Sequence, residues 1–137
     1  MLARFDSFVH NGCPQFVELN AESPAGMGYA DALTDLFLND RLLRNPRRVT
    51  SMRSAEAAVR AIRAVWKSRH GSTAPRIALV DFMSVPTRPE FLLMQGHFER
   101  LGLSCVLADP RELDFDGRTL SHNGIGIDLV YLSLIHI

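Results

Sequence analysis

The sequence has few cysteines and no long apolar run, and each absence removes a class of protein. Its 137 residues include two cysteines, Cys13 and Cys105, which lack the CxxC spacing of a zinc site and the framework of a disulfide-rich fold. Both are therefore expected to be free thiols. No stretch of 18 apolar residues occurs, and no apolar region follows the first residues. The sequence thus predicts neither a membrane span nor a signal peptide, and we expect a cytoplasmic protein.

Net charge is also absent, because 15 basic side chains balance 15 acidic ones. A neutral chain has no overall attraction for nucleic acid or anionic lipid, so neither is an expected partner. The basic residues that gather before position 49 are interpreted as a solvated linker; they are Arg41, Arg44, Arg47 and Arg48. With 47% hydrophobic and 22% charged residues, the chain has the composition of one soluble globular unit.

The C-terminal half has the pattern of a βαβ unit but lacks a glycine-rich phosphate loop. Residues 77–80 and 103–107 are apolar without alternation, as in strands buried on both faces. Between them, Thr87 and Glu90 match a capping box that begins a helix ending at Gly102. The turn at 81–86 contains no glycine, which excludes a nicotinamide or flavin site.

A small polar hairpin near Asp116 and a further strand at 127–131 complete this half. Any ligand of the sheet should bind at the carboxyl ends of its strands. In the N-terminal half, residues 2–10 and 15–20 alternate around Asn11 and Gly12, which predicts a β-hairpin. Helices are expected at 29–38 and from Ser54 to just before Gly71.

The hairpin register decides which side chains meet. Alternation places Arg4, Asp6 and Phe8 on one face of the first strand, and Phe16, Glu18 and Asn20 on one face of the second. A turn centred on Gly12 pairs Arg4 with Asn20, Asp6 with Glu18, and Phe8 with Phe16. A two-residue turn would set Asp6 opposite Val17 and mix the faces. We therefore predict an odd loop of three or five residues, or a β-bulge.

Two carboxylates placed across a strand pair repel each other, so a cation is expected between Asp6 and Glu18. Carboxylate and amide oxygens are the ligands that Mg²⁺ takes, and Mg²⁺ usually completes its shell with phosphate and water. Asn20 supplies the amide, and Arg4 could bind phosphate. The alternative is that Arg4 neutralises both acids on an exposed sheet. Spacing alone leaves both interpretations open.

These residues resemble the metal-binding hairpin of the ATP-grasp superfamily, in which an R-x-D strand is followed by an E-x-N strand. Here the two motifs are Arg4-Phe5-Asp6 and Glu18-Leu19-Asn20. The resemblance implies that Asp6, Glu18 and Asn20 bind Mg²⁺ that bridges the phosphates of ATP. It also implies that Arg4 is a catalytic residue that steadies the phosphate or the tetrahedral intermediate.

The order of the segments resembles the circularly permuted ATP-grasp family, which includes glutathionylspermidine synthetase, because here the hairpin precedes the βαβ unit. The runs NAESPAG at 20–26, VDFMSVPTRPEF at 80–91 and ADPREL at 108–113 are similar to segments of that group. The resemblance covers residues 4–131. It implies an α/β fold in which an ATP-grasp hairpin joins a Rossmann-like, pre-ATP-grasp βαβ unit.

The activity that this family implies is an ATP-dependent carboxylate–amine ligase. ATP is a substrate and Mg²⁺ the cofactor, and the amide forms through an acyl phosphate from peptide-like or other small acids and amines. Ser23 and Gly26 could receive substrate, although an ordinary Ser-Pro turn explains them equally well. Glu90 could also face substrate, although its capping box explains it without function.

Family members are longer, and their adenine-binding lysines have no counterpart here. We therefore expect an incomplete fold, a fragment that is inactive alone, divided into a hairpin-bearing part at 1–48 and a βαβ part at 49–131. Residues 132–137, including His136, resemble a translated sequencing adapter and are expected to be a non-native tail.

Two further functions stay open. The chain could be a non-catalytic homologue that serves as an interaction module. It could also be a hydrolase that uses Asp6 and Glu18 as an acid and base pair, which needs the two carboxylates about 5 to 9.5 Å apart around an open cleft.

Overall fold

A computed structural model describes residues 2–21, 24–40 and 51–132 of the chain. Ser23, the basic stretch at 41–48 and the last five residues of the expected tail lie outside the described residues. The described part is α/β, with three α-helices, one short 3-10 helix and three small sheets in the ranges just given. None of these described helices is long and apolar enough to cross a membrane.

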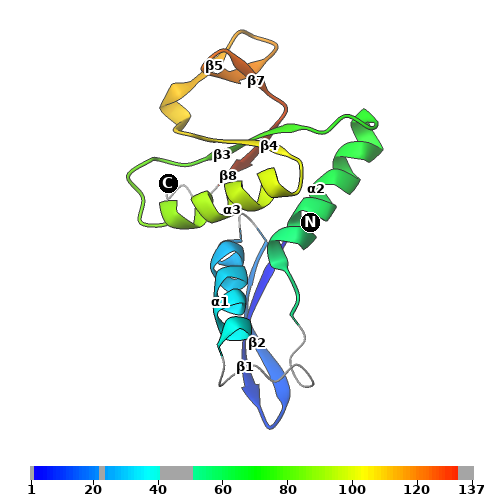
Figure 1. Cartoon of the computed structure of the whole chain (residues 1–137), viewed down its shortest axis with the longest axis vertical. Helices are drawn as coiled ribbons and strands as arrows, with labels where there is room; N and C mark the ends of the chain where they lie inside the picture. Colours follow the sequence, from blue (N-terminus) through cyan, green and yellow to red (C-terminus); the bar gives the residue numbers. More distant parts are fainter. Residues whose placement is uncertain (1, 22–23, 41–50, 133–137) are drawn as a thin grey trace.

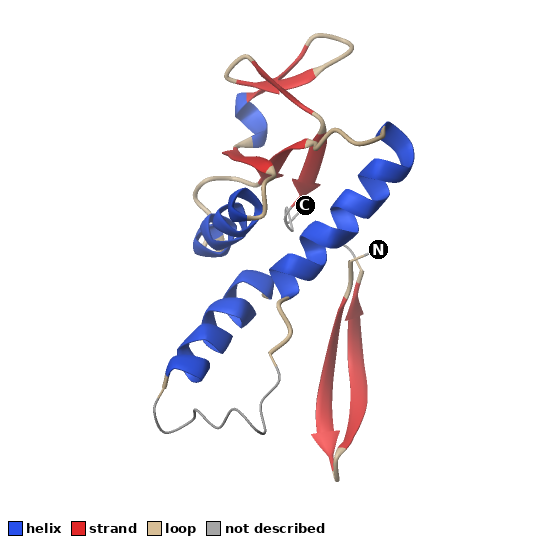
Figure 2. Ribbon diagram, turned by 45° about the vertical axis from the view of Figure 1, so that its right-hand side comes forward, coloured by secondary structure: helices blue, strands red, loops and turns tan. Residues whose placement is uncertain are grey.

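The chain opens with an antiparallel hairpin of β1 (Arg4–His10) and β2 (Cys13–Asn20). A two-residue turn joins the strands, and Asn11 and Gly12 both have positive φ, at 51° and 78°. This is the left-handed turn geometry that Asn-Gly favours. The hairpin projects from the rest of the molecule as an arm (Figures 1 and 2), and nearly all of its residues are exposed.

Two helices follow, α1 (Met27–Asn39) and α2 (Ser54–His70). The N-terminal half of α2 is buried along one face, whereas Val65 near its other end is 53% exposed. On α1 the buried residues are Gly28 and Asp31. Its larger apolar side chains are exposed, among them Leu33, Leu36 and Phe37. These three apolar side chains of α1 therefore do not pack into the described core.

A three-stranded parallel sheet confirms the βαβ prediction. Its strands are β3 (Arg76–Val80), β4 (Ser104–Ala108) and β8 (Leu129–Leu132), in the order β4-β3-β8. The crossover helix is α3 (Arg88–Arg100), which buries Phe91, Met94 and Phe98. Leu132, expected to start the tail, pairs with Val80 as the last residue of β8.

Both faces of β3 are covered, which explains its uninterrupted apolar run. On one face, Ile77 and Leu79 pack with α2 and α3. On the other, Ala78 and Val80 pack near Ile127. Behind that second face lies the short helix η1 (Pro110–Glu112) with a meander of β5 (Leu113–Phe115), β6 (Leu120–His122) and β7 (Ile125–Ile127). The expected polar hairpin is thus three-stranded.

The predicted capping box of α3 is wrong. Thr87 at the N-cap makes no side-chain capping bond, because its backbone is already helical with φ −80° and ψ −3°. Glu90 does not turn back toward Thr87 either. Its Oε1 accepts hydrogen bonds from the amides of Gly26 at 2.5 Å and Gly28 at 3.3 Å, which belong to the start of α1.

The start of α2 is held in the same way by an acid from another helix. Asp31 of α1 is 1% exposed, and its two carboxylate oxygens accept the amides of Ser54 at 2.8 Å and Ala55 at 3.0 Å. The first amides of a helix have no partner within the helix, and its N-terminal end is positive. A buried carboxylate of one helix therefore fixes the start of another. Glu90 of α3 holds the start of α1, and Asp31 of α1 holds the start of α2.

Gly28 lets α1 approach α3 closely enough for this contact. A Cβ at position 28 would lie 3.1 Å from Leu93 Cβ and 3.3 Å from the carbonyl oxygen of Glu90. We expect Gly28→Ala to lower the free energy of unfolding by about 1 to 3 kcal/mol, because backbone must shift to admit the methyl group. Urea unfolding measures this.

Gly96→Ala is the matched control, because a Cβ there meets a single atom within 4 Å, the mobile guanidinium of Arg100 at 3.4 Å. It should stabilise α3 by about 0.5 to 1 kcal/mol through helix propensity. Equal effects of the two substitutions would contradict the close approach of α1 to α3.

Candidate functional site

The hairpin register brings the two predicted carboxylates together. Asp6 lies directly opposite Glu18, and Arg4 lies opposite Asn20. The register then shifts, because Ser7 pairs with Phe16. Val17 is the extra residue of this β-bulge. The bulge reconciles a two-residue turn with the opposition of Asp6 and Glu18, as one of the two sequence predictions required.

The bulge also corrects the predicted faces. Phe16 does not share a face with Glu18, and it does not pair with Phe8, which lies opposite Gln15. Phe16 instead meets Phe5 edge to face, with ring centroids 5.4 Å apart. One extra residue moves every later side chain of the strand to the other side of the sheet. The arm thus has a polar face at its base and an apolar face behind it.

Arg4 organises the polar face. Its Nε donates to Asp6 Oδ1 at 2.7 Å and its second terminal nitrogen donates to Oδ2 at 3.0 Å, a bidentate pair. The other terminal nitrogen donates to the carbonyl oxygen of Ala25 at 3.0 Å. Arg4 therefore ties the base of the hairpin to the loop that leads into α1.

Charge on this face follows from the same contacts. The hydrogen bond from Arg4 holds the pKa of the Asp6 carboxyl below its usual value, with burial opposing the effect. The pKa of Arg4 is raised, chiefly by that bond and further by the charges of Glu18 and Glu90. Asp6 is thus an anion at neutral pH, which suits a metal ligand and does not suit a general acid.

Asn20 carries an unsatisfied buried group. Among the described side chains its Nδ2 is one of three buried nitrogen or oxygen atoms without a hydrogen-bond partner. A buried amide without a partner costs free energy, so such groups usually mark a missing ligand, ion or water. Rotating the amide by 180° would place Oδ1, a metal-ligand oxygen, at the same position.

Protein groups at the base of the hairpin supply only some of the ligands that a hard cation needs. Within 2–21, 24–40 and 51–132, no three His, Cys, Asp or Glu side chains form a group that could hold a metal ion. The base of the hairpin offers two carboxylates and one amide. A carboxylate bound to Arg4 still has free lone pairs, since it can accept about four bonds. These residues fit Mg²⁺ that takes its other ligands from phosphate and water.

Within its described part, the structure gives the predicted substrate-binding residues no contact that would test their role. Ser23 lies outside the described residues. Gly26, with φ 101° at the N-cap of α1, donates its amide to Glu90. Glu90 is 5% exposed, and its bonds to α1 give the carboxylate a structural role. Contact of Gly26 or Glu90 with substrate stays a prediction.

Two residues of the described part with buried polar groups were missed from the sequence. Tyr131, on β8, has a buried hydroxyl without a hydrogen-bond partner in the described part of the chain. Burial, and then the charge of Glu90, raises the pKa of Tyr131 to about 12. Asp31 holds α2, as described above. An acid in a helix interior was a weak signal for Asp31, whereas nothing in the sequence marks Tyr131.

Comparisons with known proteins bear on the fold. No family model matches the chain, and no curated protein matches it in sequence. Among solved structures it is similar to a glutathione synthetase-like effector from Globodera pallida in its apo form, with a TM-score of 0.62 and 14% sequence identity. The match covers 94% of this chain and 34% of the effector, so the chain spans about a third of that protein's length.

The Asp6 carboxyl provides a test of the polar face. With Arg4→Met we expect its pKa to rise toward the ordinary value, since the bidentate hydrogen bond is lost. Because the folded pKa lies below the unfolded one, the Arg4 contact stabilises the fold at neutral pH, and this contribution is lost as pH falls through the folded pKa. Carbon-detected NMR titration of the side-chain carboxyl measures it.

Arg76→Met is the matched control, because Arg76 makes the same bidentate contact with Asp128 and lowers the pKa of that carboxyl. Each substitution should move only its own aspartate. An Asp6 pKa that does not respond to Arg4→Met would contradict the geometry described here.

The role of Glu90 in holding the start of α1 is tested by the stability of substituted proteins. Glu90→Ala should lower the free energy of unfolding by about 2 kcal/mol, because the amides of Gly26 and Gly28 lose their shared acceptor, and Glu90→Gln should cost less. Urea unfolding again gives the value. Glu99→Ala, an exposed position on the same helix, should have little effect. A Glu90→Ala protein as stable as the parent would argue against the α3 to α1 connection.

Proposed function

We propose that this chain forms part of an ATP-dependent carboxylate–amine ligase of the circularly permuted ATP-grasp kind, similar to glutathionylspermidine synthetase. The observation that carries the proposal is the opposition of Asp6 to Glu18 and of Arg4 to Asn20 at the base of the hairpin. The fold shared with a glutathione synthetase-like effector is consistent with it.

In this proposal Asp6, Glu18 and Asn20 would supply oxygen ligands to Mg²⁺. A metal ion held there would reduce the charge repulsion that a carboxylate meets at the γ-phosphate. The lowered pKa of Asp6 keeps that ligand deprotonated at neutral pH. The chain's own contribution is to present oxygen ligands on one face, which the bulge at Val17 makes possible.

Arg4 has the role of holding an anion beside the metal ligands. Its guanidinium is fixed on one side by Asp6 and on the other by the carbonyl oxygen of Ala25, so little side-chain freedom is left to lose on binding. A fixed cation at this point would stabilise negative charge that develops on a transferred phosphoryl group or on a tetrahedral intermediate. The carboxylate of the acid attacks the γ-phosphate and releases ADP, and the amine then displaces phosphate from the resulting acyl phosphate to form the amide.

The alternatives are less well supported. A hydrolase that used Asp6 as its acid would need a raised pKa, and Arg4 lowers it. A non-catalytic interaction module is favoured by one feature, the exposed apolar face of the arm, where Phe5 is 59% and Phe16 68% exposed. Such a module needs no metal, so a metal titration separates it from the ligase.

Mg²⁺ titration of the isotopically labelled 137-residue chain tests the proposal, with Mn²⁺ as a paramagnetic probe of the same site. We expect Mn²⁺ to broaden the amide signals of Asp6, Glu18 and Asn20 first, and excess Mg²⁺ to restore them. Asp6→Asn and Glu18→Gln should each weaken Mg²⁺ binding at least about tenfold, since each removes a charged ligand.

Asp114→Asn serves as the control, because Asp114 is an exposed acid on β5 of a different sheet. It should leave Mg²⁺ binding unchanged. Broadening spread evenly over exposed acids, or Mg²⁺ binding that survives both Asp6→Asn and Glu18→Gln, would show that Arg4 simply neutralises a surface pair.

A further inference from the structure

A cavity of about 540 Å³ opens beside Arg4, where three segments meet. The start of β1, the loop before α1 with the first turns of that helix, and the first turns of α2 form its walls. Pockets that bind small molecules usually have volumes of about 300 to 1,000 Å³ and are mostly apolar with few polar groups. The cavity has the size and the character of such a pocket.

Small uncharged residues make most of the wall. Five of them are alanines, namely Ala3, Ala25, Ala30, Ala57 and Ala58. Ser54 adds a hydroxyl-bearing residue, and Arg4 is the one charged residue among the described residues that line the space. A second charged group on the ligand would find no opposite charge in this wall. The occupant is therefore uncharged along most of its length.

Arg4 sets the orientation of that occupant. Its guanidinium lies between Asp6 on the polar face and the carbonyl oxygen of Ala25 in the cavity wall. An anionic group placed at Arg4 would sit next to the proposed metal ligands, and the rest of the molecule would extend between Ala30 on α1 and Ala57 on α2.

From this geometry we propose that the cavity binds the chain of the acid substrate, and that this acid is a carboxylate with an uncharged, largely apolar chain. The assignment of the occupant as substrate rests on the proposed function. Binding of such a carboxylate in the cavity does not, because it rests on the apolar lining and on the two N–H groups of Arg4 beyond the three that bind Asp6 and Ala25.

Other cavities are weaker candidates. One of about 340 Å³ lies beside Trp66, which stacks on His70 with ring centroids 3.9 Å apart. It is lined by neither Arg4 nor any proposed metal ligand. Stacking between these two rings already satisfies their apolar faces, so the arrangement does not define an occupant.

Hexanoate is a suitable probe, with hexylammonium as the probe of the same chain and opposite charge. In the alanine-methyl-labelled 137-residue chain, we expect hexanoate to shift the methyl signals of Ala30 and Ala57, and hexylammonium to leave them in place. Ala57→Leu and Ala30→Leu, from opposite walls, should each weaken hexanoate binding at least about tenfold, because the added side chain fills the space.

Ala64→Leu is the matched control, since Ala64 is exposed on the same helix and does not line the cavity. It should bind hexanoate like the parent, and melting curves should show all three leucine variants folded. The inference is overturned if hexanoate leaves both methyl signals unchanged, if hexylammonium shifts them equally, or if binding survives in both Ala57→Leu and Ala30→Leu.

The metal titration reports on Asp6, Glu18 and Asn20, whereas hexanoate binding reports on alanine methyl groups, so either can fail without the other. Hexanoate binding in a chain that does not bind Mg²⁺ would support the cavity and contradict the proposed function. Mg²⁺ binding without any effect of hexanoate would support the proposed function and contradict carboxylate binding in the cavity.

Discussion

Buried carboxylates at helix N-termini hold the described part of this molecule together. Glu90 of α3 accepts the amides of Gly26 and Gly28, and Asp31 of α1 accepts those of Ser54 and Ala55. Each bond joins the positive end of one helix to an acid of another, in a setting with little water. The two contacts place α1 and α2 relative to the parallel sheet, and Arg4 then ties the hairpin to the loop before α1.

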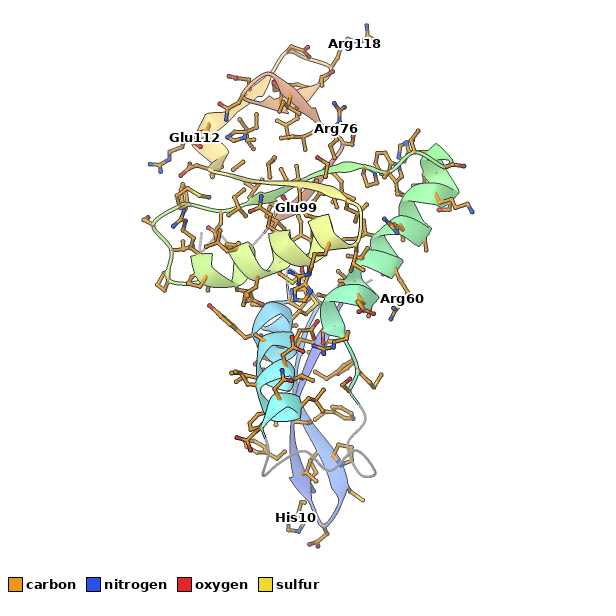
Figure 3. All side chains as sticks on the ribbon, in the orientation of Figure 1. His10, Arg60, Arg76, Glu99, Glu112 and Arg118 are labelled. Carbon is orange, nitrogen blue, oxygen red and sulfur yellow. The ribbon has the colours of Figure 1, made fainter. Side chains whose placement is uncertain are left out.

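The hairpin stands on this base and makes few contacts of its own. His10, labelled at its tip in Figure 3, lies far from the sheet. A two-stranded ribbon without packing is marginally stable in water. Its polar base is held by Arg4 and Asp6, whereas the face that carries Phe5 and Phe16 is exposed. The facing of the predicted metal ligands thus depends on the local register of the hairpin, whereas the cavity beside Arg4 depends on how α1 and α2 pack.

Sequence patterns were sufficient where local forces decide the structure. The apolar run at 77–80 predicted a strand buried on both faces, and the alternation of the hairpin strands predicted the opposition of Asp6 and Glu18 through an odd loop or a β-bulge. Patterns failed where a partner distant in sequence decides. Glu90 fitted a capping box next to Thr87, yet the unpaired amides of α1, more than 60 residues earlier, bind it. The burial of the Tyr131 hydroxyl without a hydrogen-bond partner in the described part likewise depends on tertiary packing.

The bulge at Val17 gives the arm an unusual sensitivity to chain length. One extra residue moves every later side chain of the strand to the opposite face of the hairpin. The number of residues between the turn and the base therefore decides which side chains share a face. Substitutions along β2 can be absorbed one at a time. Gain or loss of a single codon between Phe16 and Glu18, however, would invert one surface against the other, so natural variation here should favour exchange of residues over change in length.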